Sequence, residues 1–270
     1  MSSFAVVGLG FISDRHIQAI KNLGHELTAV CEVDFEKMYK SNGAKFFYNW
    51  MDLKDSKLFK TLDYVAICTP NDHHYYMIKD CLDAGVKVIC EKPPLFRKDE
   101  YDELMKHPNI DKLSIVFQCR LATGLDEIVV KDKNKVKIQI EVYRDDWYMN
   151  SWKAITEQSG GLVFNIGCHY MDLLIMLFGE MVSVGTSEIG ERRCSGSFEL
   201  DKATVEWTVA IDATIDKQKR IFEINGKNYN LTQMGFEGLH TKVYEEVIAG
   251  RGYKLKQYKP TLELINKIYD

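Results

Sequence analysis

Two short stretches of the sequence contain side chains suited to acid–base chemistry. The first is EKPP at residues 91–94, which follows the apolar run VKVIC and places Lys92 where a buried strand ends. The second contains Asn165, His169 and Asp172, whose spacing of four and three puts them on one face of a helix. A histidine can take a proton near neutral pH, and a lysine can stabilise the oxygen left behind. The competing interpretations are a solvated charge pair in a turn and a satisfied polar network in a core.

A glycine-rich turn near the N-terminus predicts a nucleotide site. Gly8, Gly10 and Ser13 form a G-x-G-x-x-S variant of the dinucleotide fingerprint, between an apolar run and an amphipathic stretch. Gly8 would permit a tight turn, and Gly10 would let backbone amides approach a pyrophosphate at the start of the helix. The cofactor contacts expected from this turn come from Gly8, Gly10, Phe11 and Ile12. A structural turn that binds no phosphate is the alternative.

An acidic residue and a second polar segment complete the expected cofactor site. Glu32, 22 residues beyond Gly10, ends a predicted strand and can accept hydrogen bonds from both hydroxyls of an adenosine ribose. Because a carboxylate there would repel a 2′-phosphate, the sequence favours NAD over NADP, with Asp34 as the competing acidic residue. The remaining cofactor contacts are expected after the fourth and fifth strands, from Thr69, Pro70, Asn71, His74, Glu91 and Lys92. Helix capping or an Asx turn is the alternative role for the polar residues after the fourth strand.

The first half of the chain alternates short apolar runs with amphipathic stretches. The predicted strands cover residues 4–10, 26–34, 45–50, 63–70, 86–93 and 112–120, and the predicted helices cover 12–23 and 73–85. Repeated strand–helix–strand units imply right-handed crossovers and a parallel sheet with helices on both faces. We therefore expect an α/β fold whose N-terminal domain, residues 1–120, is a doubly wound Rossmann sheet.

The second half has a different pattern. Apolar and polar residues alternate with period two, which predicts strands with one wet face. The predicted strands cover residues 135–145, 196–200, 203–212 and 220–231, the last with an Asn225-Gly226 hairpin turn, and the predicted helices cover 160–179 and 261–269. The last helix is expected to begin at Pro260. These elements predict an α+β domain over residues 121–270, with an open, mainly antiparallel sheet.

Composition narrows the class of protein. The 270 residues are 46% hydrophobic and 27% charged, which is typical of a globular chain, and the net charge of −4 argues against a nucleic-acid partner. The seven cysteines are scattered without metal-ligand spacing, so we expect no metal site and a reducing, cytoplasmic environment. We expect neither a signal peptide nor a membrane partner, since no apolar run approaches the ~20 residues of a membrane span.

Four motifs together resemble the Gfo/Idh/MocA oxidoreductases, which bind a nicotinamide cofactor and act on sugars or cyclitols. The motifs are GLGFISDRH, AICTPNDHH, CEKP and SGGLVFNIGCHYMDLL, and their order and spacing match from residue 4 to the C-terminus. The resemblance implies an NAD-dependent enzyme in which Lys92 and His169 are the catalytic pair. It also implies a homodimer or homotetramer assembled through the C-terminal sheet.

One departure from the family pattern narrows the resemblance. The position four before His169 is usually Asp in the family, and here it is Asn165, which cannot titrate and would orient the sugar or His169. Asp172 would fix the imidazole or cap a backbone group. With Asn165 and the stretch DDWYMNSWK, the sequence is similar to the UDP-N-acetyl-2-amino-2-deoxyglucuronate dehydrogenases of bacterial surface-polysaccharide (lipopolysaccharide) synthesis. That branch oxidises carbon 3 of a nucleotide sugar.

A nucleotide-sugar substrate would need cations and aromatic rings to bind it. The substrate contacts expected are Lys92, Arg120, Trp147, Tyr148, Trp152, Lys153, Asn165 and His169. The aromatic residues among them could instead pack beneath the sheet. His240 and Thr241 are implied by the resemblance alone. Two other functions stay open, namely a dehydrogenase of a free sugar or inositol and a non-catalytic NAD-binding regulatory protein.

Overall fold

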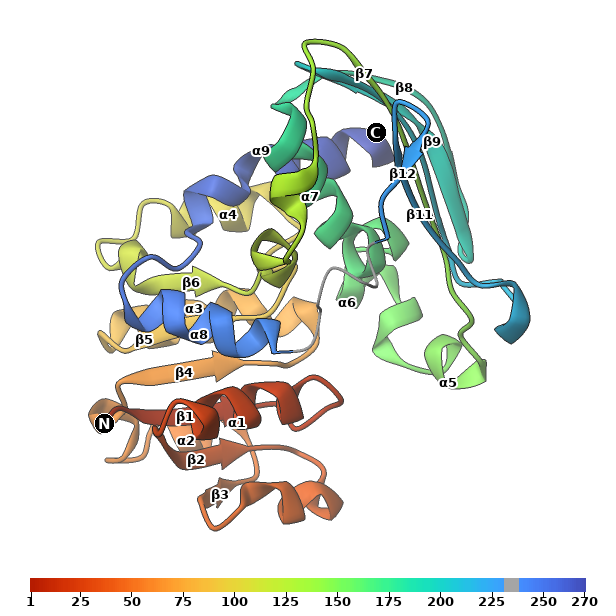
Figure 1. The fold of residues 1–270 in the computed structure, drawn as a ribbon. Coiled ribbons are helices and arrows are strands. Elements are labelled where there is room, and N and C mark those ends of the chain that lie inside the picture. The colour runs from red at the N-terminus through yellow and green to blue at the C-terminus, as the bar shows by residue number, and fades with distance from the viewer. Residues whose placement is uncertain (231–237) are drawn as a thin grey trace. The chain divides into compact units, whose positions relative to one another are not determined.

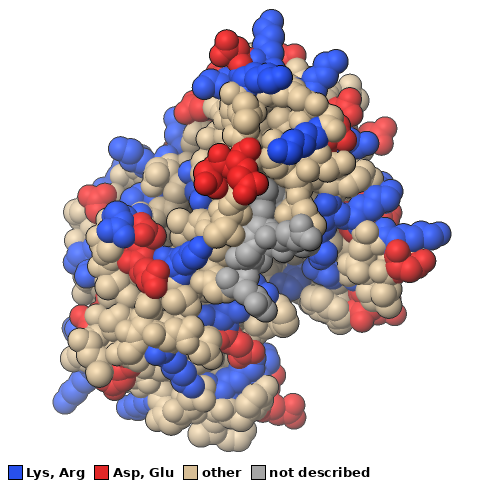
Figure 2. Space-filling view, in the orientation of Figure 1, with Lys and Arg blue, Asp and Glu red and all other residues tan. Residues whose placement is uncertain are grey.

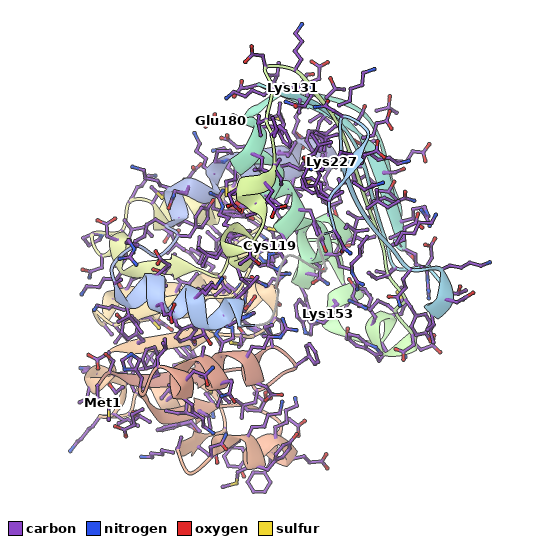
Figure 3. All side chains as sticks on the ribbon, in the orientation of Figure 1. Met1, Cys119, Lys131, Lys153, Glu180 and Lys227 are labelled. Carbon is purple, nitrogen blue, oxygen red and sulfur yellow. The ribbon has the colours of Figure 1, made fainter. Side chains whose placement is uncertain are left out.

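A computed structural model of the protein describes residues 1–230 and 238–270. The chain divides into two compact units, the first comprising Met1–Gln118 and Glu237–Gln257, the second Cys119–Phe236 and Tyr258–Asp270. Cys119, the first residue of the second unit, is labelled in Figure 3. The predicted boundary between the domains lies after residue 120. The predicted second domain, 121–270, includes Glu237–Gln257, which the structure assigns to the first unit.

The first unit is built on a six-stranded parallel sheet with the order β3-β2-β1-β4-β5-β6. Its strands are β1 (Ser3–Val7), β2 (Glu26–Cys31), β3 (Lys45–Phe47), β4 (Tyr64–Ile67), β5 (Lys87–Cys90) and β6 (Leu113–Ile115). Its helices are α1 (Ser13–Asn22), α2 (Trp50–Lys54), α3 (His74–Asp83), α4 (Lys98–Leu104) and α8 (Leu239–Ile248). All of β4 is buried, as expected for a strand covered on both faces. The strand order, which reverses between β1 and β4, confirms the predicted doubly wound sheet (Figure 1).

The turn after β1 packs closely against the chain that leaves β4. Gly8 has a φ of +86°, and a Cβ on it would lie 2.8 Å from the carbonyl carbon and oxygen of Cys68 and 2.9 Å from the nitrogen of Thr69. Glycine alone allows both this conformation and this approach. A Cβ on Gly10, in contrast, would have no heavy atom within 4 Å. The fold therefore requires the first glycine of the fingerprint but leaves space around the second.

Helix α8 comes late in the chain but packs beside α1 in the first unit (Figure 1). Leu239 and Tyr244 are fully buried, and the centroid of the Tyr244 ring lies 5.7 Å from the ring centroids of both Phe4 and His16. Burial of these side chains against β1 and α1 explains why this segment belongs to the first unit and not to the predicted C-terminal domain.

The second unit contains a six-stranded sheet with the order β12-β11-β7-β10-β9-β8. Its strands are β7 (Asn134–Glu141), β8 (Met181–Ile189), β9 (Arg193–Leu200), β10 (Ala203–Ala210), β11 (Lys219–Ile224) and β12 (Lys227–Asn228). Its helices are α5 (Asp146–Met149), α6 (Thr156–Ser159), α7 (Cys168–Phe178) and most of α9 (Leu255–Tyr269). Strands β7 and β10 are parallel and the other pairs are antiparallel, which confirms the predicted sheet type.

A helical stretch from Thr156 to Phe178 includes α6, a π-helical segment (Val163–Gly167) and α7. It packs on the sheet, since a Cβ on Gly167 would lie 3.4 Å from Cγ2 of Val209 in β10. By length and composition this is the one stretch of the described residues that could cross a membrane, so the prediction that no apolar run approaches that length is wrong. However, 61% of its most apolar window is buried, as in the core helix of a globular protein.

Several element bounds differ from the predicted ones for identifiable reasons. Strand β3 ends at Phe47 rather than at residue 50, because the Asn49 side chain caps α2 by accepting a hydrogen bond from the Asp52 nitrogen at 2.9 Å. Helix α9 begins at Leu255, so Pro260 lies inside it, where the helix forgoes one backbone hydrogen bond. The hairpin turn at residues 225–226 has positive φ at both positions, as predicted, although residue 231 of the predicted strand lies outside the described residues. Helices α2, α4, α5, α6 and α8 and strand β8 are not predicted.

Charged side chains of both signs are interspersed on the face of the molecule shown in Figure 2. Within the second unit, Arg193 forms ion pairs at 2.8 Å with both Glu141 and Asp212. The hydrogen bond from Arg193, helped by Lys219, lowers the pKa of Glu141 to about 2. Water screens the pair between Arg193 and Asp212, which are both exposed, more than the pair between Arg193 and the buried Glu141.

The contrast between the two glycines gives a stability test. Gly8→Ala should lower the free energy of unfolding by about 1–3 kcal/mol, since it combines a left-handed φ with a backbone clash. Gly10→Ala, whose Cβ would have no heavy atom within 4 Å, should change it by less than about 0.5 kcal/mol. Urea unfolding of the two variants measures the difference. Equal destabilisation would show that the close approach of Gly8 is not a constraint on the fold.

Candidate functional site

The glycine turn and the end of β2 are joined through Glu32. Its Oε2 accepts a hydrogen bond from the Leu9 nitrogen at 2.6 Å, and its Oε1 accepts one from the Asp34 nitrogen at 3.0 Å. Lys37 Nζ lies 3.7 Å from Oε2. The carboxylate is therefore at the carboxyl end of the strand, where the sequence predicts it, but it also holds the turn in place.

The same turn fits a dinucleotide. Helix α1 begins at Ser13, whose hydroxyl donates to the Gly10 carbonyl at 2.6 Å. Ile12 is the N-cap residue of α1 and Phe11 is 84% exposed. Because a helix N-terminus attracts phosphate and the space around Gly10 is open, the residues present can hold the pyrophosphate of NAD. The fit rests on the open position at Gly10 and on the direction of α1.

The segment after β4 only partly matches its predicted role. Thr69 and Pro70 follow the strand, and Asn71 begins a short 3-10 turn with its side chain buried. His74, predicted to line the cofactor site, has no exposed surface. Its Nδ1 lies 2.9 Å from the Pro93 carbonyl oxygen and its Nε2 lies 3.1 Å from the Thr69 carbonyl oxygen. His74 therefore joins two loops instead of facing a ligand, and burial lowers its pKa.

Glu91 and Lys92, which follow β5 and are both predicted to contact the cofactor, have different environments in the structure. Lys92 is half-buried and precedes a cis peptide bond to Pro93. Glu91, predicted to contact the cofactor, is 7% exposed, and its carboxylate lies among protein groups. Its Oε1 lies 2.9 Å from His16 Nε2 and 3.3 Å from His240 Nε2, while its Oε2 accepts from the Lys92 nitrogen at 3.2 Å. Glu91 is thus a buried structural anion.

The environment of Glu91 forms a cluster that sequence reasoning does not identify. Burial alone would raise the pKa of Glu91, but the hydrogen bonds from His16 and His240 hold it well below its usual range. Burial lowers the pKa of His16, whose Nδ1 lies 2.9 Å from the Tyr244 hydroxyl. In the part of the chain that the structure describes, His16, Glu91 and His240 are the one group whose ligand atoms, all within 4.8 Å of one another, could hold a metal ion.

In the second unit, the helical stretch positions two of the predicted substrate residues. Asn165 lies in the π-helical segment, a type of helix often found at functional sites. Its Nδ2 donates to the Tyr148 hydroxyl at 2.8 Å and to the Lys153 carbonyl at 3.5 Å. Tyr148 is only 2% exposed, and burial raises its pKa to about 12. Tyr148 therefore anchors α5 to the helix and does not offer a stacking surface.

The sequence predicts Asn165, His169 and Asp172 on one helix face, and the structure gives Asp172 a buried partner from outside that helix. His169 lies half-buried in the first turn of α7. Asp172 is fully buried and pairs bidentately with Arg120, at 2.7 Å to Nε and 2.9 Å to Nη2. Thr261 of α9 donates to the same carboxylate at 3.2 Å. Asp172 thus orients Arg120, one of the cations expected to bind substrate.

The remaining predicted substrate residues lie in α5 and in the short turn that follows it. Trp147 is 52% exposed, and its ring meets that of Tyr148 edge to face at 5.8 Å. Lys153, labelled in Figure 3, lies in the short turn that begins at Trp152. Its Nζ lies 4.1 Å from the centroid of the Trp152 ring. A cation over an aromatic ring beside an exposed indole can bind a ring and an anion together.

A parallel sheet whose glycine turn fits a dinucleotide, followed by a separate α+β unit, is typical of the class of two-domain dinucleotide-binding proteins. The family models agree with this class. The model described as an oxidoreductase family NAD-binding Rossmann fold matches residues 2–110, and that of the C-terminal alpha/beta domain matches residues 129–208. The chain belongs to the Gfo/Idh/MocA oxidoreductase family.

Curated relatives are similar at low identity. The chain is 27% identical over 232 residues to an uncharacterized oxidoreductase of Synechocystis sp., and 26% identical over 230 residues to the D-glucoside 3-dehydrogenase of Escherichia coli. Each match covers 78% of this chain but only 62% and 66% of the relatives. The chain therefore spans somewhat less than two thirds of the length of these proteins.

Solved structures are similar over nearly the whole chain. The WlbA (WbpB) dehydrogenase of Thermus thermophilus, in complex with NAD and UDP-GlcNAcA, gives a TM-score of 0.86 at 27% identity, covering 97% of this chain and 93% of that chain. The WlbA dehydrogenase of Bordetella pertussis, in complex with NADH and UDP-GlcNAcA, gives a TM-score of 0.82 at 19% identity, covering 99% of this chain and 94% of that one. At that identity the second similarity concerns the fold alone.

The buried ion pair of the second unit predicts a large stability effect. Asp172→Ala should lower the free energy of unfolding by about 3–5 kcal/mol, because it leaves the Arg120 guanidinium without its buried carboxylate. Glu263→Ala removes an exposed pair with Lys259 in α9 and should cost less than about 1 kcal/mol. Chemical denaturation of both variants provides the comparison. A loss below about 1 kcal/mol for Asp172→Ala would contradict the structural role of this pair.

The buried imidazole of His74 predicts a pH dependence of stability. Its pKa lies below the ordinary 6.5, so the unfolded chain takes up a proton that the native protein resists. The free energy of unfolding should therefore fall as the pH drops below 6.5 and level off below the native pKa. His74→Gln should flatten this fall, whereas His73→Gln, at an exposed position, should not. Urea unfolding at several pH values between about 7.5 and 5 measures this dependence, and identical pH dependences for all three proteins would refute it.

Proposed function

We propose that the protein is an NAD-dependent dehydrogenase that oxidises the C3 hydroxyl of a UDP-sugar uronate, with UDP-N-acetylglucosaminuronate as the leading substrate. The product is the 3-keto sugar, which an aminotransferase can use in the synthesis of a bacterial surface polysaccharide such as lipopolysaccharide. The observation that carries this proposal is the similarity over 97% of the chain to a dehydrogenase whose structure contains NAD and UDP-GlcNAcA.

The residues of the chain supply the acid–base part of this chemistry. When bound, NAD accepts the hydride that leaves the sugar carbon. His169 or Lys92 takes the proton of the same hydroxyl, so that one hydride and one proton leave together and a carbonyl remains. The other of the two donates a hydrogen bond to the oxygen as its charge develops. Trp147, Trp152 and Lys153 bind the nucleotide sugar by stacking and by charge.

Support for NAD over NADP comes from Glu32. A carboxylate at the end of β2 accepts hydrogen bonds from a free ribose and repels a 2′-phosphate. Lys37 lies 3.7 Å from this carboxylate and weakens the repulsion, so the preference is expected to be moderate. We further propose that the enzyme works in the cytoplasm, since all seven cysteines are buried thiols, and that it assembles as a dimer or tetramer through the sheet of the second unit.

A second candidate is supported by the similarity to the D-glucoside 3-dehydrogenase, which covers 78% of this chain. In that case the substrate is a glucoside or free sugar without a nucleotide, and the exposed Trp147 would have no base to stack on. The two candidates share the residues of hydride transfer and differ only in what the α5–α6 segment binds.

The experiment is to add NAD and a panel of sugars to the purified protein and to follow NADH by its absorbance. We expect UDP-N-acetylglucosaminuronate to be oxidised, and Lys92→Met and His169→Asn to lower kcat by about 10²–10⁴-fold while NAD binding, measured by thermal shift, is kept. Lys98→Met and His73→Gln, at exposed positions, are the matched controls. Oxidation of methyl glucoside but not of any UDP-sugar would reject the first candidate in favour of the second.

A further inference from the structure

A buried polar cluster in the first unit has no role in the chemistry described above. It consists of His16 from α1, Glu91 after β5, and His240 and Tyr244 from α8. Their exposed fractions are 0%, 7%, 4% and 0% respectively. Burying a carboxylate and two imidazoles costs free energy unless each is fully hydrogen-bonded, so their presence in a core calls for a specific arrangement.

The hydrogen bonds of this cluster fix the positions of its protons. An ionised Glu91 can only accept, so the His16 and His240 Nε2 atoms that approach its Oε1 must each carry a proton. His16, kept neutral by its burial, then has an unprotonated Nδ1. That nitrogen accepts from the Tyr244 hydroxyl at 2.9 Å. Tyr244 therefore donates to His16, and His16 donates to Glu91. His240 is a second donor to the same oxygen of Glu91.

The second oxygen of Glu91 connects the cluster to Lys92. While Oε1 accepts from the two imidazoles, Oε2 accepts from the backbone nitrogen of Lys92 at 3.2 Å. On the other side of Lys92, His74 Nδ1 lies 2.9 Å from the Pro93 carbonyl oxygen. The backbone is therefore held both before and after the Cα of Lys92, in each case by a buried side chain. A side chain on a backbone held in this way has a defined direction.

We propose that His16, Glu91 and His240 act as a positioning cluster that fixes the backbone of Lys92 and thereby the direction of its side chain. This inference rests on the proposed function, in which Lys92 touches the reacting hydroxyl. His16 lies in the helix that follows the glycine turn, so the cluster also links the cofactor end of the sheet to the lysine. The three residues are positioning residues, since Glu91 reaches Lys92 through its backbone and the imidazoles act through Glu91.

A divalent cation is the alternative occupant of the same three side chains, because their ligand atoms lie within 4.8 Å of one another. The hydrogen-bond geometry favours positioning, since every proton on the path is accounted for and both oxygens of Glu91 already have N–H donors. The two occupants also differ in the direction of one hydrogen bond: with a metal on His16 Nε2, the proton would lie on Nδ1, and Tyr244 would accept instead of donate.

The test compares two substitutions of His240 with one of Glu91 in the full-length protein. His240→Gln keeps an N–H donor near the Nε2 position, whereas His240→Leu removes it. Glu91→Gln replaces one acceptor oxygen by an amide donor, so one of its partners faces another donor. We expect Glu91→Gln and His240→Leu to lower kcat about 10–100-fold with the affinity for NAD nearly unchanged, and His240→Gln to recover most of that loss.

A second readout does not depend on activity. Hydrogen exchange of the Lys92 amide should become at least about tenfold faster in Glu91→Gln and His240→Leu, and less so in His240→Gln. Lys242→Gln, at an exposed position of α8, is the control for the helix itself. If the unmodified protein oxidises no sugar, the proposed function fails. The exchange rates of the Lys92 amide then test by themselves whether the cluster fixes the backbone of Lys92. If Glu91→Gln does not fold, the two His240 variants make the same comparison.

Three results would overturn the inference. One is that the unmodified enzyme is active and that Glu91→Gln or His240→Leu lowers its stability but leaves its kcat unchanged. Another is an unchanged exchange rate of the Lys92 amide in those variants. The third is one equivalent of zinc or another divalent metal in the purified protein, lost in Glu91→Gln, since the three side chains would then be ligands and not a proton-ordered cluster.

Discussion

Close packing of Gly8 against the backbone that leaves β4 is the constraint on which the first unit depends. It brings the ends of β1 and β4 together at the position where the strand order reverses, which is where ligands bind in sheets of this kind. Glu32 ties the end of β2 to the same turn through the Leu9 nitrogen. With the turn fixed, α1 starts at a defined residue, and His16 reaches Glu91 one turn later. The steric contact at Gly8 and the hydrogen bond between Leu9 and Glu32 thus set the geometry of three strand ends and a helix.

The second unit relies on polar anchors along a mostly apolar helix. Asn165 holds α5 through Tyr148, and Asp172 holds Arg120 and the helix α9 through Thr261. Each anchor is a buried polar group that is hydrogen-bonded to another element, which makes the arrangement specific at little net gain in stability. Between these anchors His169 remains half-buried, in the first turn of α7. Helix α7, held by these two anchors, therefore keeps the His169 imidazole in a defined position.

The architecture was predictable from the sequence, because runs of buried residues and a fingerprint flanked by strand and helix are local patterns. The roles of individual polar residues were less so. Whether Glu91 and His74 face a ligand or a core depends on partners such as His240 and Pro93, which are distant in sequence or act through backbone carbonyls. Arg120 was expected at a substrate because nothing in the sequence pairs it with Asp172, 52 positions away. The π-helical segment and the placement of α8 likewise arise from packing that no local pattern records.

The late position of α8 in the chain affects how the protein can be made. The first 118 residues contain all six strands of the nucleotide sheet, yet the helix that covers Phe4 and completes the bonds of His16 is translated more than 100 residues later. During synthesis on the ribosome, part of the core of the first unit stays open to water until α8 has emerged. Final closure of the first unit therefore follows translation of the intervening unit, so folding cannot proceed strictly from the first domain to the second. A nascent chain in this state is a natural client for chaperones that shield apolar surface.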